Sequence, residues 1–187
     1  IGGPSTRPYM PVGVWDETNR YGNLRNYKAT TGEGLYRRSM YTIWKRTAAP
    51  PSMLLFDAPN REICTPKRAR TNTPLQALAL MNEVTYVEAA RALAERMMKE
   101  GGDTVESRLT TGFRLVTART PDKETLAVLK SGFERRRKEF NKKPEAAKSL
   151  IMQGTSKPDP SLDAHELAAY SATASILLNL DRVVTKD

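Results

Sequence analysis

The spacing of apolar residues changes near residue 73 and divides the chain into an irregular part and a helical part. In residues 1–34, single aromatic side chains stand among Gly, Pro, Asn and Thr, a composition typical of an extended arm without regular structure. The alternation from Leu35 to Thr47 predicts a strand, although each of its faces mixes apolar and basic groups. A short apolar run, Met53 to Phe56, predicts a second strand within a proline-rich loop.

Beyond residue 73 the apolar residues recur every three or four positions, which is the period of an amphipathic helix. Thr73 and Pro74 form a typical helix start, and this first helix is expected to break around Asn82. A second helix should end at Gly101, because glycine commonly terminates helices. The later stripes predict three more helices: one over about 103–118, one capped by Thr120 and Pro121, and a short one opened by Pro144.

The last helix should begin at a capping box, Asp163-x-x-Glu166, in which each side chain satisfies a backbone N–H of the other residue. From Leu167 to Leu180 the helix is apolar on most sides and rich in alanine, as expected for the central helix of a bundle. The predicted fold is therefore mainly α. We expect a bundle of about five helices over residues 73–187, preceded by an irregular basic arm over residues 1–72 with one or two short strands.

The 187 residues fit one domain, or one domain with an arm, and carry a net charge of +9. Residues 1–73 hold twelve Lys and Arg against five Asp and Glu, which places most of the surplus in the arm. No apolar run is long enough to span a membrane. The chain starts at Ile1 without an initiator Met or a signal-peptide core, so we expect it to begin inside a longer protein with any targeting signal upstream.

One cysteine and one histidine limit the chemistry available to the chain. Cys64 alone excludes an internal disulfide, and the sequence has no C-x-x-C-H motif for covalent haem. We expect Cys64 to be a buried, inert thiol and His165, in the first turn of the last helix, to serve as a surface or cap residue. Neither the phosphate-binding nor the dinucleotide-binding glycine motif is present.

One set of residues interleaves cations with aromatic rings and is our candidate site for an anion or a substrate. Guanidinium groups bind carboxylates, sulfates and phosphates, and rings stack on sugars or cations. The same set can instead anchor the arm through Arg–carboxylate and cation–π contacts, and we favour this structural interpretation. The set comprises Arg37, Arg38, Trp44, Lys45, Arg46, Arg61, Arg68 and Arg70. A separate basic run, Arg135 to Lys138, is interpreted as a solvated helix face.

Several longer strings in the chain carry a resemblance to a known family. They are Gly2–Ser5, Leu35–Arg46, Pro50–Met53, Phe56–Pro59, Thr71–Leu78, Ala89–Arg91, Phe113–Leu115 and Leu178–Asp181. Together they resemble the planctomycete-specific domain of unknown function number 1553 over essentially the whole chain. The helical half that normally precedes the Gly-Gly-Pro-Ser string in this family is absent, so the chain resembles the C-terminal part of the domain.

The resemblance implies a large exported, extracytoplasmic protein with a c-type cytochrome domain upstream. It supplies no catalytic residues, and the haem would belong to the upstream part of that protein, with no cofactor in this chain. The helices of the chain should then present an apolar face to the missing half or to another chain.

Three functions compete at this point. The first is a non-catalytic scaffold or docking module of a cytochrome-associated protein. The second is part of a polysaccharide-active enzyme, with the basic-aromatic segment contributing to a groove for an anionic polysaccharide. Nucleic-acid binding is the third and is not favoured, because the chain lacks a recognition helix or an aromatic RNA-binding motif.

Overall fold

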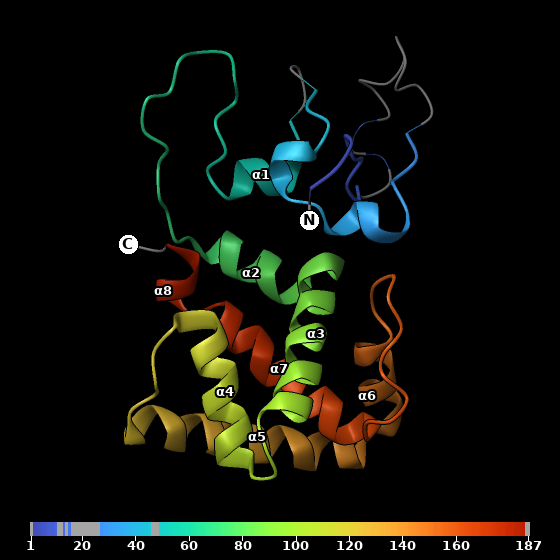
Figure 1. The fold of residues 1–187 in the computed structure, drawn as a ribbon, viewed down its shortest axis with the longest axis vertical. Helices are drawn as coiled ribbons and strands as arrows, with labels where there is room; N and C mark the ends of the chain where they lie inside the picture. The colour runs from blue at the N-terminus through green and yellow to red at the C-terminus, as the bar shows by residue number, and fades with distance from the viewer. Residues whose placement is uncertain (1, 11–12, 14, 16–26, 46–48, 186–187) are drawn as a thin grey trace. The chain divides into compact units, whose positions relative to one another are not determined.

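The computed structural model describes residues 2–10, 13, 15, 27–45 and 49–185, and the chain divides into two compact units, residues 1–71 and 72–187. Figure 1 shows that helices account for most of the second unit. The expectation of a mainly helical protein is confirmed. Within the described ranges no strand is formed.

The first unit contains short helical turns where strands were predicted. Two 3-10 helices, η1 (Gly32–Tyr36) and η2 (Ser39–Tyr41), contain five residues of the expected first strand, at positions 35, 36 and 39–41. Among the described residues of this segment, the one ladder contact is an isolated parallel bridge between Thr6 and Thr42. A strand in this segment would carry basic and apolar groups on both faces, so neither face could be buried cleanly.

The second predicted strand is wrong for a different reason. Its residues lie in α1 (Pro51–Leu55), which has Pro51 at its first position, where the fixed φ of proline suits a helix and the missing N–H costs nothing. The backbone N–H of Phe56 donates to the carbonyl of Ser52 at 3.2 Å and completes the turn.

The second unit contains seven helices among its described residues, more than the five or so expected. They are α2 (Pro74–Asn82), α3 (Val84–Glu100), α4 (Val105–Thr117), α5 (Lys123–Lys142), α6 (Pro144–Ile151), α7 (Ala164–Leu178) and α8 (Asp181–Val184). The break expected around Asn82 separates α2 from α3. The short α8 was not anticipated.

Side-chain caps fix where these helices begin. Thr73 and Gln76 form a complete capping box on α2, each accepting a backbone N–H from the other. Asp122 caps α5 by accepting the N–H of Thr125 at 2.7 Å. The expectation that Thr120 and Pro121 cap this helix was wrong, because the N-cap is the next residue along the chain.

The capping box expected on α7 is only half formed. Asp163 accepts the N–H of Glu166 at 2.8 Å, as predicted. Glu166 instead turns to Arg108 on α4, with an Nη1–Oε1 distance of 3.2 Å. A charged partner is a stronger attraction for this carboxylate than a neutral backbone N–H.

Helix α7 is the centre of the second unit, as its apolar composition predicted. Figure 1 shows it running behind α3 and above α5, and it packs against both and against α6. Leu167 and Tyr170 are fully enclosed, and the Tyr170 ring lies 4.3 Å from that of Phe133 on α5. The alanines of α7 let the neighbouring helices approach closely. At the crossing of α3 and α4 the same need is met by Gly112, where a Cβ would lie 2.6 Å from the Met97 sulfur.

None of the helices in the described ranges combines the length and the apolar character needed to cross a bilayer.

Replacing Phe133 by Ala should destabilise the second unit by about 3–5 kcal/mol, because a fully buried ring would leave a cavity against Tyr170. Val128→Ala on the same helix is the matched control, since Val128 is 72% exposed, and it should change stability by less than about 0.5 kcal/mol. Urea unfolding of both variants measures the difference. Equal losses would show that α5 does not pack on α7 as described.

Candidate functional site

The basic-aromatic candidate residues lie in the first unit, which is held together by backbone contacts around Thr6. The N–H of Thr6 donates to the Tyr41 carbonyl at 2.8 Å, and the N–H of Ile43 donates to the Thr6 carbonyl at 2.9 Å. The buried Thr6 hydroxyl donates to the Gly34 carbonyl at 2.6 Å. These bonds bring the start of the chain beside the segment that contains η1 and η2.

Arg37 binds the backbone of the Gly-Gly-Pro-Ser string, residues 2–5. Its Nη1 donates to the Pro4 carbonyl at 2.8 Å, and a Cβ on Gly3 would lie 2.9 Å from its Nε. Gly3 also has φ +147°, which L side chains rarely adopt. Glycine is favoured at this position by its φ, and a larger residue would also displace the Arg37 side chain.

Two of the candidate cations lie over tryptophan rings. The Arg61 guanidinium carbon is 4.5 Å from the centre of the Trp44 ring, and Lys45 Nζ is 5.8 Å from that of Trp15. Trp15 is buried and meets Tyr27 edge to face, with 5.1 Å between ring centres. These are cation–π contacts of the kind that the structural interpretation of the set invokes.

Tyr27 ties the same cluster to the backbone. Its hydroxyl donates to the Pro8 carbonyl, and burial raises the pKa of Tyr27 to about 12 despite the opposing charge of Arg7.

Arg68 and Asp57 close the base of an exposed loop, residues 59–70. Arg68 donates from Nε to the Asp57 carbonyl at 2.8 Å and from Nη2 to the Phe56 carbonyl, just beyond the end of α1. The Asp57 carboxylate accepts the N–H of Thr71 at 2.8 Å and its hydroxyl as well. The two ends of the loop are thus fastened side by side.

The side chains of this loop leave an open hollow lined by Lys67, Arg68, Ala69 and Arg70. Arg38 is exposed on the surface at the start of η2. Arg46, which was also a candidate, lies outside the described residues. The described candidates thus fall into separate groups by their contacts. Arg37 binds the Pro4 carbonyl, Arg61 and Lys45 lie over tryptophan rings, and Arg68 and Arg70 line the hollow. Within the described part of the arm they do not form one continuous groove.

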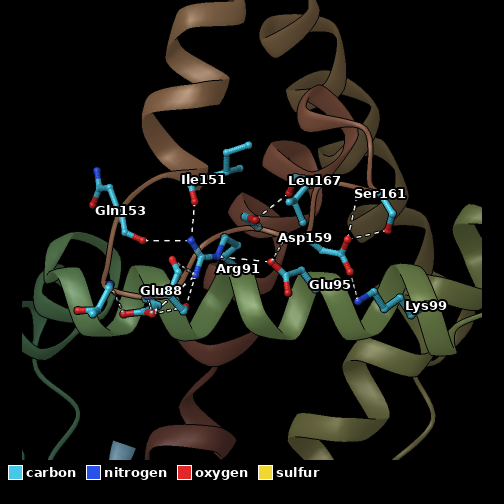
Figure 2. Close-up of polar contacts among 12 residues, drawn as sticks. Glu88, Arg91, Glu95, Lys99, Ile151, Gln153, Asp159, Ser161 and Leu167 are labelled. Atoms are coloured by element: carbon cyan, nitrogen blue, oxygen red, sulfur yellow. Dashed lines mark hydrogen bonds and ion pairs between the residues drawn. The ribbon is translucent and has the colours of Figure 1, made fainter. Parts of the chain in front are cut away.

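A second polar cluster, which was not a candidate from the sequence, is buried in the helical unit (Figure 2). Glu88 and Arg91 on α3 are only 7% and 2% exposed. The Glu88 carboxylate accepts the N–H groups of Thr155 at 3.1 Å and Ser156 at 2.8 Å, together with the Ser156 hydroxyl. Both acceptor oxygens are thereby directed at the connection between α6 and α7.

Arg91 binds the same connection from the neighbouring turn. Its Nη1 donates to the carbonyl at the end of α6, Ile151, at 2.6 Å, and its Nη2 donates to that of Ser156 at 2.9 Å. Glu88 and Glu95 approach it on either side at 3.7 and 3.6 Å, which balances the buried charge. We call Glu88, Arg91 and their bonds to residues 151–156 the α3 clamp.

Gly154 is the position in this connection where the backbone must come closest to the clamp. Its φ is +96°, and a Cβ would lie 2.4 Å from the Glu88 Oε2 atom. Any side chain would therefore displace the carboxylate as well as strain the backbone.

The far end of the connection is fixed by Asp159. Its N–H donates to Glu95 at 3.3 Å, and its carboxylate pairs with Lys99 and accepts from Ser161. The bond from Lys99, followed by the bonds from Ser161, holds the pKa of Asp159 well below its usual range.

The donors of Arg91 and the carboxylate of Glu88 are directed at the protein itself, so the α3 clamp is a structural device. The sequence held one signal of it. Glu88, Arg91 and Glu95 recur at helical spacing beside the buried Ala90 and Ala94, so charges share a face with core positions.

The two residues singled out for their reactivity have different environments. Cys64 is exposed in the loop of residues 59–70, so the expectation of a buried thiol was wrong, because that loop has no apolar cluster to enclose it. His165 is half-buried, with Nδ1 3.1 Å from the Phe140 carbonyl. Across the described ranges, no group of three His, Cys, Asp or Glu side chains is placed to hold a metal ion.

The comparisons with known proteins give one match. The family model PSD1, described as protein of unknown function (DUF1553), matches residues 1–133. The match thus ends within α5 and leaves residues 134–187 outside it. No curated protein and no solved structure matches the chain.

Replacing Arg91 by Met should destabilise the second unit by about 3–5 kcal/mol, because Glu88 would remain buried without its cation. Arg96→Met is the matched control. Arg96 forms an exposed pair with Glu100 on the same helix, so its loss should have little effect on urea unfolding. If the two substitutions cost the same, the clamp does not stabilise the fold.

The Asp159 carboxylate should stabilise the fold in a pH-dependent way. Because its pKa is lowered by folding, its contribution is present above the unfolded value of about 3.9 and is lost as the pH falls below it. Asp159→Asn should therefore differ most from the native protein at neutral pH, and the gap in urea midpoint should narrow progressively as the pH falls from about 4 toward the lower folded pKa. A gap that stays constant over this range would contradict the assignment.

Proposed function

We propose that this chain, which belongs to the PSD1 family of proteins of unknown function (DUF1553), is a non-catalytic docking module of a larger protein. The observation that carries the proposal is the outer face of α2. Leu75, Leu78 and Met81 follow one another at three-residue intervals and are 60%, 54% and 47% exposed. Three large apolar side chains on one exposed helix face favour a covering partner.

The exposed face of α2 differs from the other exposed apolar residues of the helical unit. Leu115, Val128, Met152 and Ile176 each lie on or beside a different helix and stand singly, as is normal on any protein surface. The α2 residues are contiguous. Removing them from water would contribute about 25 cal/mol for each Å² covered.

The face is also rigidly presented, which lowers the entropic cost of binding. Gln76, on the opposite side of α2, is buried and completes the capping box at the start of the helix. Asn179, at the end of α7, donates to the Ala77 carbonyl at 3.5 Å. Asn72 donates to Asp181 of α8 at 2.6 Å and holds the segment that leads into α2.

The contacts of the arm support the same function. Arg37, Arg61 and Arg68 are engaged with backbone carbonyls or with a tryptophan ring of their own unit. Side chains used in this way order an irregular segment and are less available to a substrate.

A second candidate function is supported by the hollow at residues 67–70. Three cations around an open hollow suit the sulfate or carboxylate groups of a polysaccharide. The chain would then be part of a polysaccharide-active enzyme, and these residues would bind its anionic substrate.

The context of the module is part of the proposal and is supported by the family resemblance alone. The partner of α2 would be the upstream part of the same protein or another chain. The parent would be an exported planctomycete protein with a c-type haem in its upstream part, located outside the cytoplasm. A single cysteine cannot form the two thioether bonds of such a haem, so the haem would not lie in this chain.

The docking proposal predicts that α2 becomes inaccessible in the parent protein. In Leu78→Cys, peptide-resolved labelling of the new thiol should be roughly tenfold slower in the parent than in the 187-residue chain. The exposed native Cys64 provides an internal reference for the reagent. Val128→Cys on α5 is the matched control, because Val128 is exposed outside the proposed face and its labelling rate should not change.

Equal labelling of Leu78→Cys in the parent and in the chain would contradict the docking function. A second outcome that contradicts it is slow labelling in the chain by itself, with sedimentation showing a dimer, because α2 would then bind a second copy.

A further inference from the structure

The second half of α5 holds the densest concentration of positive charge in the helical unit. Residues 135–143 contain six cations and one carboxylate, Glu139. The cations are Arg135, Arg136, Arg137, Lys138, Lys142 and Lys143. Figure 1 shows α5 at the edge of the second unit, with α3, α4 and α7 all on one side of it.

These charges are not neutralised by the protein. Several cations elsewhere in the unit are paired, as Arg96 is with Glu100, Lys99 with Asp159 and Lys130 with Glu106. For the six cations of residues 135–143, no carboxylate oxygen of the described chain lies within 4 Å. Partial burial and then the charge of Arg135 lower the pKa of Arg136, with Glu139 acting in the opposite sense. Like charges are thus held close together, and Glu139, which shares their side of the helix, offsets them only in part.

The helix dipole explains only part of this arrangement. Cations are favoured in the last turn of a helix, which accounts for Lys142 and its neighbour Lys143. The dipole effect falls off within that turn. Arg135 to Lys138 precede the last turn, so the helix dipole does not account for these four charges.

Three of the cations form a row. Arg135, Lys138 and Lys142 are spaced by three and four residues, so they share one face of α5 over about 10 Å of its length. Phe133 is fully buried on the other side of the helix. The guanidinium of Arg136 lies along the helix over Gly132, where a Cβ would be 2.8 Å from its Nη1.

We propose that this row, Arg135, Lys138 and Lys142, binds a linear polysaccharide that carries sulfate or carboxylate groups. The site is distinct from the α2 face and does not depend on the docking function. Charge complementarity requires an anionic occupant. A single row favours one linear chain of charges, whereas a duplex would bring phosphates to a much wider surface.

The composition of this face favours a polysaccharide over other anionic partners. A row of exposed cations without large apolar side chains matches poorly a bilayer surface, which also takes up apolar residues, and the centre of a protein interface, where charged residues are depleted. Single-stranded nucleic acid requires aromatic platforms for its bases. Phe133 and Phe140 are the aromatic residues of this half of α5, and both pack in the core.

The test uses the 187-residue chain and fluorescent dextran sulfate at about 50 mM salt, with uncharged dextran as the blank and duplex DNA as a competitor. In Arg135→Gln/Lys138→Gln/Lys142→Gln the affinity should fall at least about tenfold, and the slope of log K against log salt should shrink by about 2. Thermal unfolding of the variant should be unchanged, because these side chains are exposed.

The matched control removes the same charge from the arm through Arg38→Gln/Lys67→Gln/Arg70→Gln, and it should bind within about twofold of the native chain. Four results would overturn the proposal. They are no binding by the native chain at low salt, equal losses in both variants, a greater loss in the arm variant, and displacement of dextran sulfate by a lower concentration of duplex DNA. A loss confined to the arm variant would instead support the hollow at residues 67–70.

Discussion

The burial of a charged pair on α3 is the constraint on which the helical unit depends. Removing Glu88 and Arg91 from water is costly unless every donor and acceptor finds a partner. The connection between α6 and α7 supplies most of those partners through its backbone and the Ser156 hydroxyl, and Glu95 lies 3.6 Å from the remaining Arg91 donor, Nε. Satisfying the pair therefore fixes where α6 ends and how the chain enters α7.

This dependence extends across the boundary of the family match. Residues 1–133 are matched, yet α7 and the partners of the α3 clamp lie beyond residue 133. Without α7 the buried side chains Met97, Leu109 and Phe133 would lose the surface they pack against. The structural unit is thus longer than the matched segment, because its core is completed from outside it.

The helices could be predicted from the sequence because apolar periodicity and caps act locally. The central position of α7 followed from its alanines and the break near Asn82 from its polar residues. The prediction of two strands in the arm was wrong for two reasons. Pro51 favours a helix start, and the mixed faces of Leu35 to Ile43 give a strand no purely apolar side to bury. The α3 clamp escaped prediction since its partners are backbone groups about sixty residues away. Of the candidate site, the interleaving of cations and rings allowed contacts such as that of Arg61 with Trp44 to be expected, but the bond of Arg37 to a backbone carbonyl and the separation of the set into groups required the fold.

The helical unit then offers two different surfaces on one rigid frame, an apolar face on α2 and a basic row on α5. The clamp joins α3 of this frame to the connection between α6 and α7, and α2 packs against α3 while α5 packs against α7. Amide hydrogen exchange at Thr155 and Ser156 tests this most directly. The clamp predicts that these two amides, although they lie in an exposed loop, exchange as slowly as those of α7. Exchange as fast as that of an unprotected loop would contradict it.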